Sequence, residues 1–169
     1  MKQMVTDKTL ETRRKGKAEN KGIPAKRVES VTVKLIREKS FLFKERVVNS
    51  PNQAYELIKD LLEDKDREVL MACFLDTKNQ PIATNIVSIG SLNSSIIHPR
   101  EIFKVAILCN SDNFILFHNH PSGVVEPSSE DISATSRIKE CGKLMGITLT
   151  DHIIVGNDQY FSMLENGLL

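Results

Sequence analysis

The chain of 169 residues is 40% hydrophobic and 27% charged, with a formal net charge of +1. These values are typical of a soluble globular protein with one domain and a core of its own. No run of 18 apolar residues occurs and no apolar segment follows the charged N-terminus, so we expect a cytoplasmic protein without a membrane span or secretory signal. The cysteines Cys73, Cys109 and Cys141 lack C-x-x-C spacing, which favours reduced, buried thiols.

The charge is unevenly distributed along the chain. Residues 1–27 carry nine Lys and Arg against three acidic residues, a net +6, and the remainder carries a net −5. Residues 1–28 also lack aromatic side chains and any helical or strand period, so we predict a basic, disordered tail followed by a folded domain at 29–169. Such a tail could contact nucleic-acid phosphates nonspecifically, but a solvated leader explains it more simply.

From residue 29 onward, hydrophobic patterns predict strands and helices in alternation. Apolar runs between polar turns predict strands at residues 31–36, 68–76, 81–90, 113–118, 147–156 and 160–164, with 41–48 extending or pairing with the first. Apolar residues at helical spacing predict helices at residues 51–64, 98–110 and 128–146. Pro51 and Pro99 suit helix starts, and Gly146 suits a helix end. This order indicates an α/β fold with a mixed β-sheet flanked by helices.

The most informative stretch is ILFHNHPSGVVEPSSEDI, residues 115–132. His118 ends a predicted strand and His120 follows two residues later, so both imidazoles point to the same side of the sheet. Asp131 lies in the first turn of the next predicted helix, across a short loop from that strand end. Two histidines and one carboxylate, with a fourth position open for water, form the ligand set of a catalytic zinc ion.

Two alternatives compete with the zinc hypothesis. The stretch Ser128 to Asp131 fits the S-x-x-[DE] capping box, which needs no metal, and His118 could be an ordinary hydrogen-bonded residue at a strand end. Spacing alone favours neither the metal site nor the cap. The letters HNH also suggest a nuclease, but those nucleases draw the three residues from separated parts of a hairpin and helix. Three adjacent letters do not reproduce that site.

Longer motifs point to a family. His118-x-His120-Pro121, six residues, then Ser128-x-x-Asp131 matches the JAMM signature of the MPN, or JAB, metallopeptidase superfamily. The stretches SIGSLNSSIIHPREIFK, FHNHPSG, PSSEDI and DHIIVG resemble the RadC family of JAB-domain proteins. The resemblance implies the three-layer JAB/MPN architecture, which is similar to that of cytidine deaminases. RadC proteins commonly carry an N-terminal helix-hairpin-helix region, and we expect a short form without it here.

The resemblance also implies roles for individual residues. The implied ligands of one Zn²⁺ per chain, with water as the fourth ligand, are His118, His120 and Asp131. Glu68, which begins the first core strand, would be the general base, and Ser128 would orient the water or stabilise the oxyanion. Composition alone offers three rivals to Glu68, namely Glu101, Glu126 and Glu130.

These residues together predict a zinc-dependent metallopeptidase that hydrolyses a peptide or isopeptide bond in a peptide or protein substrate. The alternative is a DNA-repair-associated protein that binds nucleic acid or acts as a scaffold, with a non-catalytic zinc. Asn119 and Ser122, beside the expected ligands, could bind substrate. We expect His152 to hydrogen-bond near the metal rather than to ligate it. The sequence specifies no oligomeric state.

Overall fold

The computed structural model of the protein describes residues 26–62, 64–90 and 97–169. The chain divides into two compact units, Met1–Val33 and Lys34–Leu169. In the first unit, residues 26–33 are exposed and form neither helix nor strand. Most of the predicted disordered tail, residues 1–25, lies outside the described residues.

The two strands predicted first in the chain do not form. Residues 31–36 and 41–48 contain neither helix nor strand, so these predictions were wrong. An alternating apolar pattern favours a strand only where a neighbouring strand supplies hydrogen bonds, and the sheet is assembled from residues further along the chain. Val48 is nevertheless buried, and its backbone N–H donates to the Asn79 carbonyl at 2.9 Å. The folded core therefore takes in the chain just before the first helix.

The other predicted elements are confirmed with small shifts at their ends. Within the described residues the order is α1 (Pro51–Leu62), β1 (Val69–Leu75), β2 (Pro81–Ile89), α2 (Pro99–Leu108), β3 (Asn113–Asn119), α3 (Ser129–Met145), β4 (Thr148–Gly156) and β5 (Gln159–Ser162). The strands form one mixed sheet in the order β2-β1-β3-β4-β5, in which only β3 and β4 run parallel. The predicted α/β fold with a mixed sheet is confirmed.

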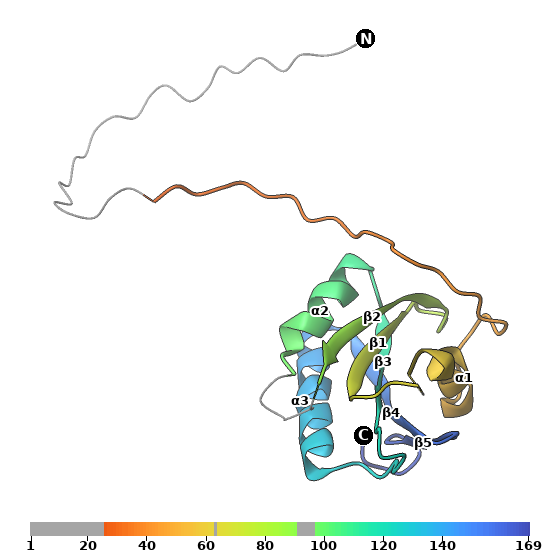
Figure 1. Cartoon of the computed structure of the whole chain (residues 1–169). Coiled ribbons are helices and arrows are strands. Elements are labelled where there is room, and N and C mark those ends of the chain that lie inside the picture. The colour runs from red at the N-terminus through yellow and green to blue at the C-terminus, as the bar shows by residue number, and fades with distance from the viewer. Residues whose placement is uncertain (1–25, 63, 91–96) are drawn as a thin grey trace, which may run out of the picture. The chain divides into compact units, whose positions relative to one another are not determined.

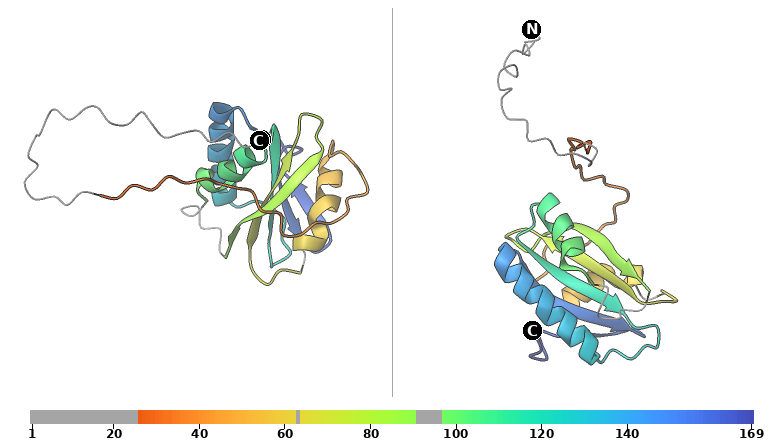
Figure 2. Two further views of the ribbon diagram at one scale, coloured as in Figure 1. Left: turned by 90° about the horizontal axis from the view of Figure 1, so that it is seen from above. Right: turned by 90° about the vertical axis from the view of Figure 1, so that its left-hand side faces the viewer.

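Helices cover both faces of the sheet, which makes three layers (Figures 1 and 2). The α1 face buries side chains such as Ile58, Phe117 and Ile153. The opposite face, under α2 and α3, buries a second cluster that includes Phe74 and Ile138. Strands β1 and β3 are buried along their whole lengths because helices pack on both of their sides. This burial explains why their sequences are continuous apolar runs.

The connection from β3 through α3 to β4 determines where the predicted site residues meet. A parallel strand pair requires a crossover, and α3 provides it. The end of β3 and the start of α3 therefore lie at the same end of the sheet, joined by the loop at residues 120–128. Gly146 ends α3 in the left-handed conformation, with φ 67°, as its predicted C-cap role requires.

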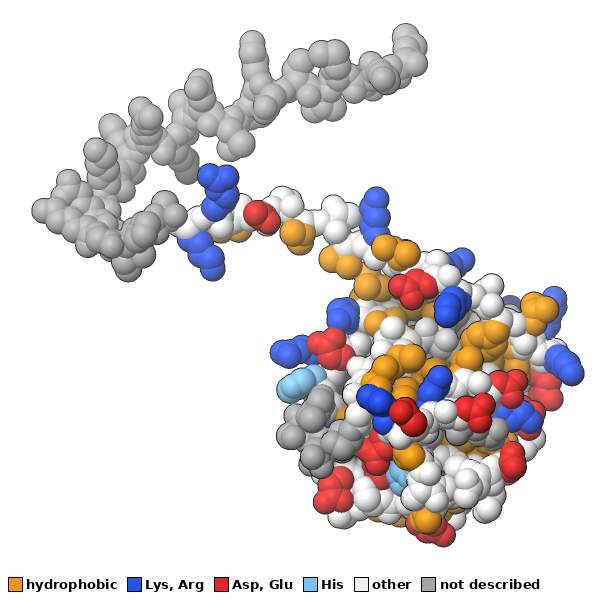
Figure 3. Space-filling model, in the orientation of Figure 1, with side chains coloured by type: hydrophobic (Ala, Val, Ile, Leu, Met, Phe, Trp, Pro, Cys, Tyr) orange, Lys and Arg blue, Asp and Glu red, His pale blue; other side chains and the backbone are white. Residues whose placement is uncertain are grey.

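The surface and the cysteines agree with an ordinary globular domain. Acidic and basic side chains are interspersed on the face shown in Figure 3. None of the helices in the described ranges is long and apolar enough to cross a membrane. The three cysteines are free thiols, with Cys73 and Cys109 buried as predicted and Cys141 half-buried. Burial raises the pKa of the Cys73 thiol to about 12, so this thiol is inert packing.

Candidate metal centre

The end of β3 carries two histidines on one face of the sheet. His118 is fully buried within β3, and the backbone N–H of His120 donates to the Val155 carbonyl at 2.9 Å, which continues the pairing with β4 by one residue. Because the backbone stays extended across these positions, the two imidazoles point the same way, as predicted. Their Nε2 atoms lie 2.9 Å apart.

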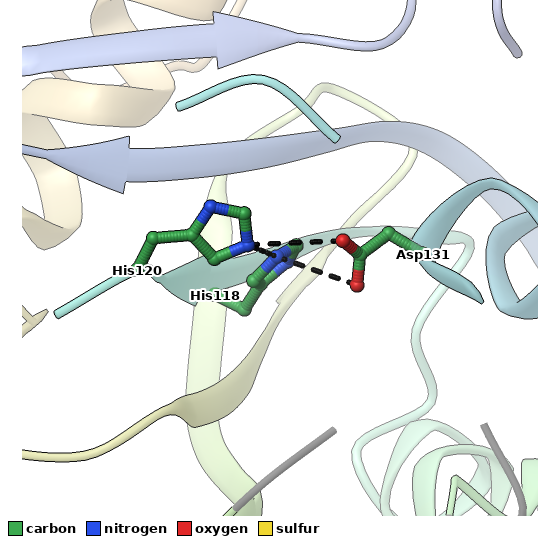
Figure 4. A group of neighbouring side chains, drawn as sticks. All are labelled: His118, His120 and Asp131. Carbon is green, nitrogen blue, oxygen red and sulfur yellow. Dashed lines mark hydrogen bonds and ion pairs between the residues drawn. The ribbon is translucent and has the colours of Figure 1, made fainter. Parts of the chain in front are cut away.

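The first turn of α3 brings a carboxylate to the same place. Oδ1 of Asp131 lies 3.6 Å from Nε2 of His118, and Oδ2 lies 3.7 Å from Nε2 of His120. Figure 4 shows the carboxylate facing both rings from the helix start. The three side chains offer ligand atoms that all lie within 4.8 Å of one another. The convergence predicted across the loop is present.

The capping box is present as well, so the metal site and the cap are compatible. The Ser128 side chain accepts a hydrogen bond from the Asp131 backbone N–H at 3.1 Å, and the Ser128 N–H donates to Asp131 Oδ2 at 2.9 Å. The Ser128 hydroxyl also donates to Oδ2 at 2.5 Å. These bonds cap α3 and fix the carboxylate, and Oδ1 still faces His118. The cap orients the candidate ligand instead of replacing it.

The geometry of these three residues fits a tetrahedral metal ion. Zinc with ligand distances near 2.0–2.1 Å separates its ligand atoms by about 3.3 Å. Here the two Nε2 atoms lie 2.9 Å apart, each has a different Asp131 oxygen at 3.6 or 3.7 Å, and one ligand atom from each residue fits within 4.8 Å. Nδ1 of His120 lies 2.5 Å from the Val124 carbonyl, which can only accept, so Nδ1 carries a proton. In the neutral ring Nε2 then keeps its lone pair and faces the other ligands. Two nitrogens and one oxygen are a donor set that zinc accepts.

The pKa shifts at His118 and Asp131 keep these two side chains in the protonation states that bind a cation. Burial, with His152 adding to it, holds the pKa of His118 well below its usual range, so this ring is neutral at pH 7. Burial alone would raise the pKa of Asp131, but His120, His118 and the Ser128 hydrogen bonds outweigh it and hold that pKa well below normal. The nearby Asp131 carboxylate raises the pKa of His120. A metal would therefore compete with a proton mainly at His120.

Glu68 lies at the edge of this site. It immediately precedes β1, and its backbone carbonyl accepts a hydrogen bond from the Gly90 N–H at 2.9 Å. Strand β1 pairs antiparallel with β3, with Leu70 opposite His118, so continuing this register by two residues sets Glu68 opposite His120. Its charge contributes to the raised pKa of His120. The half-buried Glu68 therefore shares a face with both histidines.

The rival glutamates lie elsewhere. Glu101 belongs to α2, where it forms surface ion pairs with Lys104 and Arg100. Glu130 is exposed and accepts a hydrogen bond from the Ser129 hydroxyl at 3.0 Å. The side chain of Glu126 is exposed on the loop before α3. Among these four residues, Glu68 alone is both half-buried and electrostatically linked to His120, a candidate ligand.

The side chain of Asn119, a residue suggested above to bind substrate, makes hydrogen bonds to the backbone around Glu68. Its side chain is buried and accepts from the Val69 N–H at 2.8 Å, while its amide donates to the Arg67 carbonyl at 3.1 Å. These bonds hold the chain on both sides of Glu68. Ser122 is exposed and accepts from the Val124 N–H at 3.3 Å, within the turn.

His152 contacts a candidate ligand, in line with its expected position. It is buried on β4, and its Nε2 lies 2.8 Å from Nδ1 of His118. Its Nδ1 lies 2.6 Å from the hydroxyl of Thr135, a buried residue on α3 that sequence reasoning missed. Burial lowers the pKa of His152 to about 4. The one available sequence signal for Thr135 is its place one helical turn after Asp131.

Comparisons with known proteins match most of the folded part of the chain. A sequence model of the RadC-like JAB domain matches residues 48–168. A protein of Clostridium tetani called UPF0758 protein is 51% identical over 122 residues, which is 72% of this chain and 54% of the relative. A Methanosarcina mazei protein of the same name is 45% identical over 124 residues, 73% of this chain and 54% of the relative. The chain thus spans about half the length of these curated relatives.

Proposed function

The chain belongs to the RadC-like JAB domain family, and we propose that it is a zinc-dependent peptidase that hydrolyses a peptide or isopeptide bond. The observation that carries the proposal is the convergence of His118, His120 and Asp131 beside Glu68. Two imidazoles and one carboxylate leave a coordination position for water, which distinguishes catalytic from structural zinc sites. Zinc held there would lower the pKa of water to about 7 and polarise the attacked carbonyl.

The protein side chains would supply proton transfer and orientation. Glu68, opposite His120 by strand register, would accept the proton of the attacking water and deliver it to the leaving amine. Asn119 would support this transfer by fixing the backbone before and after Glu68. The position of Glu68 relative to the two histidines would therefore be set by hydrogen bonds between the Asn119 side chain and the backbone on either side of Glu68.

Ser128 would act chiefly through Asp131. Its hydroxyl proton is directed to Asp131 Oδ2 at 2.5 Å, so it is already committed to the carboxylate. A hydrogen bond from Ser128 to the developing oxyanion would require this bond to exchange during the reaction. Holding the carboxylate toward His118 is the role that the resting geometry supports.

Two measurements test the proposal in sequence. Elemental analysis of the purified protein should find about one zinc per chain, and the H118A/H120A double variant should contain none. The zinc-loaded protein is then assayed on a mixture of fluorescence-quenched peptides. The Glu68→Gln variant should keep its zinc and lose about 100-fold or more of the activity, as expected for removal of a general base.

Glu126→Gln is the matched control, because Glu126 is an exposed glutamate on the loop before α3. This variant should retain both zinc and activity. A zinc-loaded wild-type protein that cleaves no amide bond, in peptides or in protein conjugates, would refute the peptidase proposal even if the metal site is real.

The basic N-terminal segment supports a second candidate function. Residues 1–27 carry a net +6, which suits nonspecific contact with nucleic acid. If the chain acts by binding DNA, affinity for a random duplex should fall steeply with added salt and disappear when residues 1–27 are removed. The peptidase activity should be indifferent to the same deletion.

A further inference from the structure

A chain of buried hydrogen bonds runs from α3 to the ligand His118. The Thr135 hydroxyl donates to the Asp131 backbone carbonyl at 2.6 Å, and the same hydroxyl lies 2.6 Å from Nδ1 of His152. Nε2 of His152 then lies 2.8 Å from Nδ1 of His118. Thr135, His152 and His118 are each at most 2% exposed, so water does not substitute for any of these partners.

The protons available on these side chains determine which atom donates and which accepts in each hydrogen bond between Thr135 and His118. A hydroxyl has one proton, and Thr135 directs it to the Asp131 carbonyl, so toward His152 the hydroxyl can only accept. Nδ1 of His152 must then carry the ring proton, and Nε2 of the neutral ring accepts. That acceptor takes the Nδ1 proton of His118. Nε2 of His118 is left with a free lone pair, directed at His120 and Asp131.

The reverse arrangement would close the metal site. If Thr135 donated to His152 instead, His152 would donate from Nε2 and His118 would accept at Nδ1. The proton of His118 would then sit on Nε2 and point at Nε2 of His120, 2.9 Å away. Zinc would have to displace that proton before it could bind. The direction of the Thr135 hydrogen bond therefore decides whether Nε2 of His118 is free to bind a metal or is blocked by a proton.

We propose that Thr135 and His152 are positioning residues that hold His118 in the tautomer able to bind the metal, with the Asp131 backbone carbonyl setting the direction of the hydrogen bonds. The inference rests on the metal site of the proposed function and deepens it. Asp131 would then serve twice, because its carboxylate faces the metal position and its carbonyl orients the hydroxyl that selects the His118 tautomer. Neither Thr135 nor His152 touches the metal position itself.

The first test measures zinc affinity of the full chain by competition with a chelator. Thr135→Val keeps the side-chain shape and removes the hydroxyl, so His152 is expected to shift its proton to Nε2 rather than leave a buried N–H without an acceptor. We expect zinc affinity to fall about 10- to 100-fold, the usual cost of losing a partner of a ligating histidine. Thr135→Ser restores the hydroxyl and should restore the affinity.

Thr150→Val is the matched control, because Thr150 donates its hydroxyl to Asn113 Oδ1 at 3.1 Å, at the far end of β3. This variant should bind zinc like the wild type. Wild-type affinity in Thr135→Val would overturn the proposal. Equal losses in Thr135→Val and Thr135→Ser would overturn it too, since they would show a packing effect.

The second test reads the tautomers directly and needs no variant. Long-range ¹H–¹⁵N NMR of the metal-free full chain, at about pH 8 where these rings are neutral, distinguishes protonated from bare ring nitrogens. We expect the proton on Nδ1 in both His118 and His152. A proton on Nε2 of His152 would refute the inference. A wild-type protein that binds no zinc would instead refute the metal site, and the tautomers would still report on the hydrogen-bond chain.

Discussion

Replacing Ser128 by alanine measures how much the capping box stabilises the start of α3. The substitution removes the acceptor for the Asp131 N–H and the hydroxyl that donates to Asp131 Oδ2. It leaves the third bond of the capping box, from the Ser128 N–H to Oδ2 at 2.9 Å. The helix start therefore loses two of three hydrogen bonds, while the backbone path into α3 is unchanged.

The expected cost follows from these two bonds. Loss of a serine N-cap typically costs about 1 kcal/mol, and a hydrogen bond to a charged group contributes about 1.5–3 kcal/mol when buried. Ser128 is exposed, so water replaces part of both bonds. We therefore expect the free energy of unfolding to fall by about 1–2 kcal/mol. The released carboxylate should also lower zinc affinity by roughly 10-fold.

Urea unfolding of the metal-free protein, followed by circular dichroism, measures the first effect, and the midpoint should drop by about 0.5–1 M. Ser128→Thr keeps the hydroxyl and should lie close to wild type. Ser129→Ala is the neighbouring control, because the Ser129 hydroxyl donates to the exposed Glu130 side chain and takes no part in the capping box. If Ser128→Ala is no less stable than Ser129→Ala, the capping box does not hold the start of α3 and the reasoning fails.

Three other perturbations give distinct outcomes. Burial lowers the pKa of His152 to about 4 from 6.5, so the unfolded chain binds the extra proton, and this residue should cost the metal-free protein about 2 kcal/mol of unfolding free energy between pH 7 and pH 5, in addition to the cost from the buried His118. His152→Gln should make the urea-midpoint profile shallower by that share, with the share of His118 remaining, and an unchanged slope would contradict the assignment. Gly156→Ala would put a Cβ 2.9 Å from backbone atoms of Gly123, so we expect a loss of about 1–3 kcal/mol in urea unfolding and weaker zinc binding as the loop that holds His120 shifts. Zinc at 100 times its Kd should raise the unfolding free energy by about 2.7 kcal/mol, and calorimetry should show no such gain in the H118A/H120A variant.

Much of this protein could be predicted from local sequence. Within the part of the chain that the structure describes, apolar runs bounded by polar turns located all five strands of the sheet, and helical spacing with Pro51, Pro99 and Gly146 located the three helices. These predictions succeed because side-chain periodicity and helix capping are properties of a few neighbouring residues. The common orientation of His118 and His120 follows from the two-residue period of extended backbone in the same way.

The early strands failed for a reason that lies outside their own sequence. Residues 31–36 have the alternation of a half-buried strand, yet they remain exposed coil. A strand needs a neighbouring strand to hydrogen-bond with, and the pairings of all the strands together determine which segments join the sheet. Local pattern carries no information about that competition.

Long-range pairing also decided the composition of the site. The antiparallel register of β1 and β3 brings Glu68, 50 residues before His118, to the histidine face, which no spacing rule within one segment contains. The partnership of Thr135 with His152 depends equally on α3 packing against β4. The sequence by itself determined where the helices and the sheet strands lie and which residue types form the candidate metal site, because those features depend on neighbours in the chain. The tertiary structure decided which residues surround the ligands, because those contacts join segments that meet only when the sheet and its covering helices assemble.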